Sequence, residues 1–128
     1  MKSIFEEAIL SNDQMITLVK MLKKNYRLIL LSNNNLPTIE ILRNKHQDML
    51  SLFEKQYFSM ELKLRKPSKE LFAYVIKDSN LDPKESLFID DKDNNVKQAQ
   101  EAGLRAILFT DVDNFKTQLR ELGVKANF

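Results

Sequence analysis

Residues 86–95 of the chain read SLFIDDKDNN, an apolar triplet that runs directly into two adjacent aspartates. Leu87, Phe88 and Ile89 offer apolar side chains to both faces of an extended chain, as is typical of a strand buried within a parallel sheet. A helical pattern of Val96, Ala99 and Ala102 follows and stops at Gly103, a residue suited to the left-handed position after a helix. The stretch therefore predicts a buried strand that ends in two carboxylates and is followed by a helix.

The same alternation of helix and short strand extends in both directions from this stretch. A strand is expected over residues 28–31, ended by Ser32, with further strands over residues 57–60 and 106–109. Apolar residues at helical spacing predict helices around them; these residues are Met15, Leu18, Val19, Leu22, Ile39, Leu42, Leu71, Phe72, Val75, Ile76, Phe115, Leu119 and Leu122. The order predicts an α/β protein, a three-layer Rossmann-like sandwich with a mainly parallel sheet.

Composition limits the classes of function. The chain has 128 residues, of which 43% are hydrophobic, and this suits a single domain. Its 20 basic and 18 acidic residues give a formal charge of only +2, so we expect neither a nucleic acid nor a membrane as partner. The absence of cysteine excludes a disulfide framework and a thiolate site, and together with the absence of a leader pattern it predicts a cytoplasmic protein.

Polar residues are expected at one edge of the sheet, where the carboxyl ends of its parallel strands meet and where ligands of open α/β sheets bind. Adjacent carboxylates hold a hard cation such as Mg²⁺, while a lysine and a hydroxyl neutralise and bind phosphoryl oxygens. The chain supplies such groups, together with an amide that can orient a carboxylate; they are Ser32, Asn33, Lys66, Asp90, Asp91 and Asn95. These residues predict a site for phosphate and Mg²⁺.

Three segments carry a resemblance to a known family: LLSNNN, KLRKPSKELF and FIDDKDNNVKQAQEAGLRAILF. In this order they resemble the haloacid dehalogenase superfamily of hydrolases, most closely its phosphatase-like subgroup, over nearly the whole chain. The resemblance implies one core domain over residues 1–128, and Mg²⁺-dependent hydrolysis of a small phosphorylated metabolite.

The resemblance also implies a role for each matched residue. Ser32 and Asn33 would bind the transferred phosphoryl group, and Lys66 would stabilise its charge, so Ser32 and Lys66 are the catalytic candidates. Asp91 would be the direct Mg²⁺ ligand, with Asp90 beside it in the metal site. Asn95 would support this pair.

The chain departs from the family at its first motif, an apolar strand that ends in Asp-x-Asp and supplies the nucleophilic aspartate. Residues 1–26 contain a single aspartate, Asp13, within a helical pattern, and the cap that usually follows the motif is missing as well. Asp111 and Asp113 also follow an apolar strand, but we assign them to a turn that caps the last helix through Asp113 or Asn114. We therefore expect a catalytically incomplete chain that binds Mg²⁺ weakly.

Two other classes of protein stay open at this point. One is a non-catalytic module that keeps the phosphate and metal pocket. The other is a permuted receiver-like phosphoacceptor domain, although the order of its motifs differs and the aspartates available as phosphoacceptor, Asp48 and Asp78, lie in helical stretches.

The missing motif also has a consequence for the sheet. In the family, the nucleophile strand lies between the strand ending at Ser32 and the strand ending at Asp90. Without it, backbone groups in the middle of the core would have no partners, and such groups are costly. We expect either that residues 27–31 and 87–89 pair directly, or that a second copy donates residues 2–10 and forms a homodimer.

Overall fold

The computed structural model of the chain describes residues 2–6, 13–32, 36–45, 47–63 and 69–124, and of residues 2–6 it describes the backbone. The strands are β1 (Lys2–Glu6), β2 (Arg27–Ser32), β3 (Lys55–Phe58), β4 (Ser86–Asp90) and β5 (Arg105–Leu108). The helices are α1 (Asp13–Lys23), α2 (Leu36–Lys45), α3 (Gln47–Leu50), α4 (Ser59–Leu62), α5 (Lys69–Asp78), α6 (Asp93–Glu101) and α7 (Val112–Glu121).

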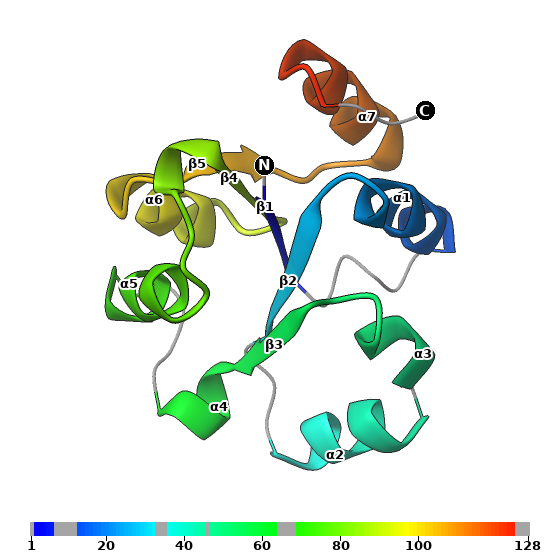
Figure 1. Cartoon of the computed structure of the whole chain (residues 1–128), viewed down its shortest axis with the longest axis vertical. Coiled ribbons are helices and arrows are strands. Elements are labelled where there is room, and N and C mark those ends of the chain that lie inside the picture. Colours follow the sequence, from blue (N-terminus) through cyan, green and yellow to red (C-terminus); the bar gives the residue numbers. More distant parts are fainter. Residues whose placement is uncertain (1, 7–12, 33–35, 46, 64–68, 125–128) are drawn as a thin grey trace.

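The five strands form one sheet in the order β3-β2-β1-β4-β5, and every neighbouring pair is parallel. Helices α5 and α6 lie on one side of this sheet, and α1, α2, α3 and α7 lie on the other (Figure 1). The three-layer α/β architecture expected from the sequence is therefore confirmed.

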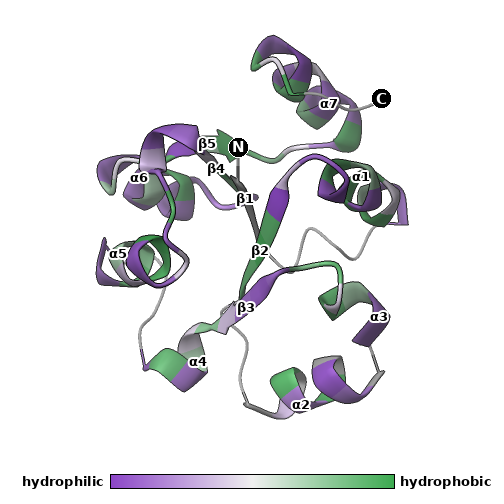
Figure 2. Ribbon diagram, in the orientation of Figure 1, coloured by the Kyte–Doolittle hydropathy of each residue, from purple (hydrophilic) through white to green (hydrophobic). Residues whose placement is uncertain are grey.

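Burial on both faces explains the continuous apolar runs in the strands. In β2, Leu28 and Leu30 belong to the cluster under α1 and α7, whereas Ile29 and Leu31 belong to the cluster under α5 and α6. The helices carry both hydrophobic and hydrophilic residues, as the mixed colours of Figure 2 show, and their apolar residues supply the rest of the two clusters. On the α5–α6 side, for example, the rings of Phe72 and Phe88 meet edge to face, 5.0 Å apart.

The middle of the sheet differs from both of our expectations. Strand β1 of the same chain lies between β2 and β4, where Ile4 pairs with Ile29 on one side and with Phe88 on the other. Direct pairing of β2 with β4 and donation of this segment by a second copy were both wrong. The segment that we expected to fill the gap does fill it, but from within the chain, because this satisfies the strand edges without a partner molecule.

Smaller differences occur near the ends of other elements. The third strand covers 55–58 rather than 57–60, because Ser59–Leu62 forms the short helix α4 directly after it. Asp111, rather than Asp113 or Asn114, caps α7: its side chain accepts a hydrogen bond of 2.7 Å from the Asn114 N–H. Leu122, which we placed on the buried face of that helix, lies just beyond it and is 37% exposed.

The strand order does not separate this fold from the permuted receiver-like alternative. Receiver-type sheets have the order 2-1-3-4-5, and such a sheet permuted to begin at its third strand has the order 3-2-1-4-5 found here. Asp48 lies in α3 and Asp78 ends α5, so neither follows a strand as a phosphoacceptor at the ligand-binding edge would.

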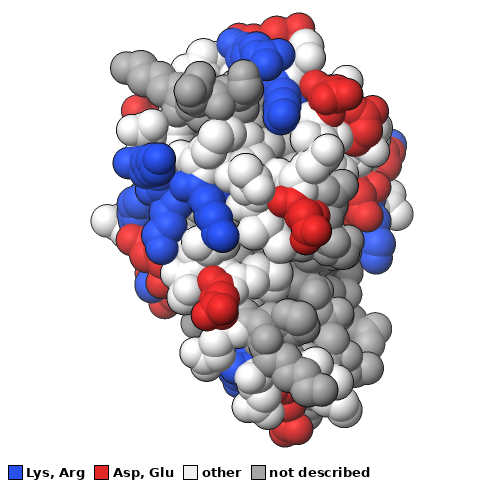
Figure 3. Space-filling view, turned by 90° about the vertical axis from the view of Figure 1, so that its right-hand side faces the viewer, with Lys and Arg blue, Asp and Glu red and all other residues white. Residues whose placement is uncertain are grey.

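The surface has no field of a single sign on the face that carries the α1, α2 and α3 layer, where acidic and basic side chains both occur (Figure 3). This agrees with the nearly balanced formal charge of +2. Within the described residues, no helix combines the length and the apolar character needed to cross a membrane.

Candidate functional site

The candidate site lies at the carboxyl edge of the sheet, on the strands next to β1. Ser32 is the last residue of β2 and Asp90 the last of β4, and both are fully buried. Phe5 of β1 pairs with Leu30 on one side and with Ile89 on the other. Ser32 and Asp91 therefore each lie two positions beyond this common level, on strands separated by two strand spacings, or roughly 10 Å.

Asp90 is held by hydrogen bonds from the chain that follows it. Its Oδ1 accepts a bond of 2.9 Å from the Lys92 N–H, and its Oδ2 accepts a bond of 2.9 Å from Nδ2 of Asn95. The Asp90 carbonyl accepts a further bond of 2.8 Å from the Phe109 N–H, which ties the end of β4 to the residue after β5. Since both carboxylate oxygens already have donors, Asp90 is a rigid support within the site.

Asn95 is positioned by α6. This helix begins at Asp93, so Asn95 lies in its first turn, and only 5% of the residue is exposed. Val96 and Ala99 on the same helix are buried against the sheet and fix the direction in which the first turn points. The predicted support of the acidic pair by Asn95 is thus present as a direct hydrogen bond to Asp90.

Asp91 is exposed, unlike Asp90, and its pKa is raised above the ordinary value of an aspartate. Partial burial of the carboxyl contributes most, followed by a hydrogen bond with Asp90 and by repulsion from the Asp90 charge; the backbone N–H of Asp91 and the nearby Lys92 act in the opposite direction. Ionised Asp91 is therefore opposed by its surroundings, and a bound cation would relieve this.

The remaining predicted site residues are Ser32, Asn33 and Lys66. Ser32 lies across β1 from the acidic pair. Asn33 and Lys66 lie outside the described residues. The structure thus brings Asp90, Asp91 and Asn95 together and places Ser32 on the other neighbour of the central strand.

Glu6 is a residue that our sequence reasoning missed. It is the last residue of β1 and pairs in register with Leu31, so it occupies the carboxyl end of the middle strand, next to both halves of the site. The signal was present as SIFEE, a short apolar run before two acidic residues. The pattern does not match the family's first motif, because the apolar run is short and glutamates follow it.

The donor set suits Mg²⁺ in kind, because the exposed carboxylate of Asp91 provides the hard oxygen ligand that this ion prefers, with buried Asp90 supporting it. The charge repulsion within the pair points in the same direction. Among the side chains that the structure describes, however, no group of three or more acidic or histidine residues is placed to hold a metal. The site therefore fits Mg²⁺ with few protein ligands.

Comparison with known proteins identifies the family of the chain. The family model of the haloacid dehalogenase-like hydrolases matches residues 2–103. The chain belongs to this family of hydrolases.

Its relatives include a drimenol cyclase from Aspergillus calidoustus, 34% identical over 110 residues that make up 83% of this chain and 21% of the relative. A D-ribitol-5-phosphate phosphatase from Bacteroides thetaiotaomicron is 34% identical over 88 residues, which make up 64% of this chain and 42% of the phosphatase. The chain thus spans less than half the length of these two relatives.

A solved structure of a haloacid dehalogenase family enzyme from Bacteroides thetaiotaomicron, in complex with magnesium and inorganic phosphate, has a similar fold. It is 32% identical to this chain, with a TM-score of 0.71, and the match covers 81% of this chain and 57% of the enzyme.

Proposed function

We propose that the chain is the phosphate- and Mg²⁺-binding core of a phosphatase-type hydrolase, with a small phosphorylated metabolite as its ligand. The observation that carries the proposal is the acidic pair at the end of β4, in which buried Asp90 is held by Asn95 and exposed Asp91 has a raised pKa. The phosphatase among the relatives, and the related enzyme bound to magnesium and phosphate, support the same chemistry.

Each residue at this edge has a role in the proposal. Asp91 binds Mg²⁺ directly, while Asp90 holds the turn that presents it. Ser32, on the other side of β1, and Asn33 bind the phosphoryl oxygens, and Lys66 neutralises their charge. A bound Mg²⁺ would supply positive charge beside the phosphate, where catalysis of phosphoryl transfer depends mainly on electrostatic stabilisation.

We further propose that the chain by itself binds phosphate without rapid turnover. The covalent route needs a nucleophilic aspartate, and β1 ends in Glu6 instead. The chain is then a binding or complementing module of the hydrolase family. Its location in the cytoplasm is a separate prediction from the sequence. A second candidate function is true hydrolysis with Glu6 as the carboxylate nucleophile, and it is favoured by the position of Glu6 at the end of the central strand.

The test compares the hydrolysis of p-nitrophenyl phosphate in the presence of Mg²⁺ by the chain and by its Asp91→Ala variant. We expect equal rates at the level of the background. A robust rate that Asp91→Ala abolishes would overturn the proposal of slow turnover, and Glu6→Gln would then show whether Glu6 is the nucleophile.

Binding is measured separately, by titrating inorganic phosphate in the presence of Mg²⁺ and following the protein by calorimetry. We expect weak binding that Asp91→Ala removes. Asp93→Ala is the matched control, because Asp93 is an exposed aspartate two positions away whose ion pair is with Lys97, at 2.9 Å. Loss of phosphate binding in both variants, or in neither, would contradict the assigned role of Asp91.

A further inference from the structure

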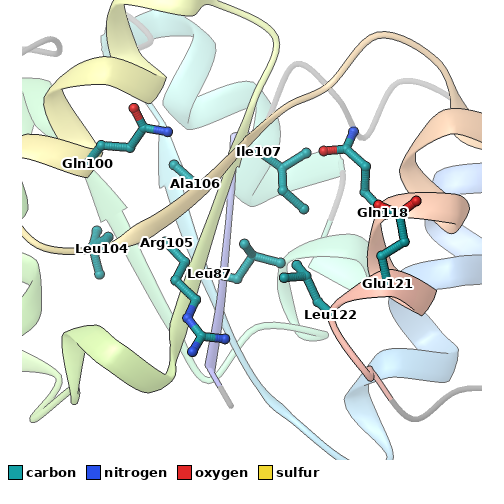
Figure 4. Close-up of a pocket in the computed structure, with 9 residues that line it drawn as sticks. All are labelled: Leu87, Gln100, Leu104, Arg105, Ala106, Ile107, Gln118, Glu121 and Leu122. Carbon is teal, nitrogen blue, oxygen red and sulfur yellow. The ribbon is translucent and has the colours of Figure 1, made fainter.

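The edge strand β5 has an open side. It pairs with β4 alone among the described strands, so its other edge faces outward. A hollow of about 400 Å³ runs along this edge, and Leu87, Ala106 and Ile107 form its apolar floor. Figure 4 shows Gln100 of α6 on one side of β5, and Gln118 and Glu121 of α7 on the other. The edge is thus framed by two helices that leave room for an extended segment.

The opposite edge of the sheet is occupied differently. Strand β3 begins at Lys55, whose Nζ lies 3.3 Å from Oδ2 of Asp78, and such charged residues discourage edge pairing. Gln56 Nε2 donates a bond of 2.7 Å to the Leu50 carbonyl, and α4 follows β3 at once. Strand β5, in contrast, ends in Leu108, which is 36% exposed, so β5 is the edge better suited to pairing.

Charge is distributed unequally along β5. Arg105 begins the strand and is exposed, and it makes no ion pair with the described part of the chain, although Glu121 lines the same hollow. Beyond the other end of the strand, Asp111 and Asp113 line a second hollow together with Phe109 and Thr110. One end of the edge is therefore available as a cation, and the other end carries two carboxylates.

This distribution selects one direction of pairing. A parallel second strand would place like charges at the same end, whereas an antiparallel strand related by a twofold axis places the arginine of each copy beside the acidic turn of the other. Directly opposed residues of antiparallel strands point to the same face of the sheet, so a twofold axis perpendicular to the sheet passes through a pair of identical residues. With the axis at Ile107, Arg105 would lie opposite Phe109 of the second copy, at the start of its acidic turn. The same contact then occurs twice, as in every twofold interface.

We propose that a second copy of this chain docks on this edge, with the two β5 strands pairing antiparallel and the two five-stranded sheets joining into one. Backbone hydrogen bonds supply the attraction, as in other cases of strand addition. The two symmetric contacts between Arg105 and the acidic turn set the direction. The partially exposed Leu108 and Leu122 lose solvent contact as the flanking helices of the two copies approach.

Sedimentation equilibrium of the full chain tests the proposal, and thermal unfolding checks that each variant is folded. We expect the wild type to be a dimer, and Arg105→Glu or Asp113→Arg to raise the dimer dissociation constant about tenfold, since each exchanges two attractive rim contacts for repulsive ones. The double variant should recover most of the loss. Lys77→Glu, an exposed charge reversal on α5, is the matched control and should have no effect.

Crosslinking tests the register directly, because the chain contains no cysteine. Phe109→Cys and Arg105→Cys variants, mixed and oxidised, should form a disulfide between copies, whereas each variant alone should not, because identical positions lie roughly 13 Å apart along the antiparallel strands. A monomer at all concentrations would overturn the proposal. So would a dimer that ignores Arg105→Glu, or crosslinking that is equal in the mixed and single samples.

Discussion

Replacement of Asn95 by alanine tests whether the acidic pair depends on the hydrogen bond between Asn95 and Asp90. The bond is 2.9 Å long, its acceptor is a carboxylate on a fully buried residue, and Asn95 itself is only 5% exposed. A hydrogen bond to a charged group contributes about 1.5–3 kcal/mol, and the full burial of Asp90 keeps bulk solvent from replacing the lost donor. We therefore expect Asn95→Ala to lower the free energy of unfolding by this amount, apart from the helix-propensity gain of alanine.

Asn94→Ala is the matched control, because Asn94 is the preceding residue of α6, carries the same side chain and is exposed. Alanine favours a helix over asparagine by roughly 0.5 kcal/mol, and this gain is common to both variants. For 128 residues the entropy of unfolding is about 0.27 kcal/mol/K, so the melting temperatures of the two variants should differ by roughly 6–11 °C.

Scanning calorimetry in the absence of metal measures this difference. In an Asp90→Asn background, Asn95→Ala should cost only about 1 kcal/mol, because the acceptor is no longer charged. If Asn94→Ala and Asn95→Ala unfold within about 0.5 kcal/mol of each other, the hydrogen bond does not support the site and the reasoning fails.

Three other predictions concern charge and backbone conformation. Without metal, Asp91→Asn should increase the free energy of unfolding by up to about 1 kcal/mol and so raise the melting temperature, because burial and Asp90 oppose the ionised Asp91 carboxyl. Mg²⁺ should stabilise the wild type, with millimolar or weaker affinity, but not this variant. Micromolar affinity would show that a further carboxylate binds the ion. Asp78 accepts a 2.5 Å hydrogen bond from the Tyr57 hydroxyl, and this bond lowers the pKa of Asp78 below 3.8. The contribution of Asp78 to stability should therefore be present above pH 3.8 and be lost as the pH falls through the lowered pKa. Urea midpoints of the wild type and Asp78→Asn that stay equally far apart from pH 6 to pH 2 would contradict this. Gly103→Ala should lower the free energy of unfolding in urea by about 1–2 kcal/mol, because Gly103 has a φ of +94°, which strains a residue with a Cβ. The added Cβ itself would make only an ordinary contact with Pro83, at 3.8 Å. An unchanged urea midpoint would show that alanine is not strained at this position.

Several parts of the fold were accessible from the sequence because the residues that specify them are close together in the chain. Leu87, Phe88 and Ile89 form the buried strand β4, and the helix after it ends where Gly103 adopts a positive φ. Asn95 and Asp90 are five residues apart, so one strand, one turn and the first turn of a helix suffice to bring them into contact. Local spacing alone decides such a contact.

The last helix shows a limit of the same reasoning. Its N-terminus carries Asp111, Asp113 and Asn114, all of which favour a capping position. The cap is Asp111, whose extended backbone (φ −154°, ψ 168°) lets its side chain reach the Asn114 N–H. The choice depends on where β5 ends and on the burial of Val112, the first residue of α7, against the core, and these are tertiary facts.

The sequence by itself determined the alternation of helices and strands, the parallel sheet and the acidic turn Asp90–Asp91 with its support from Asn95, because short-range periodicity and local hydrogen bonds specify them. Only the tertiary structure decided what occupies the middle of the sheet. Residues 2–6 have a weak apolar pattern, and their pairing with β2 and β4 joins segments about 25 and 84 residues away in the chain. The need to pair every buried backbone group selects this strand, and it places Glu6 at the centre of the site edge.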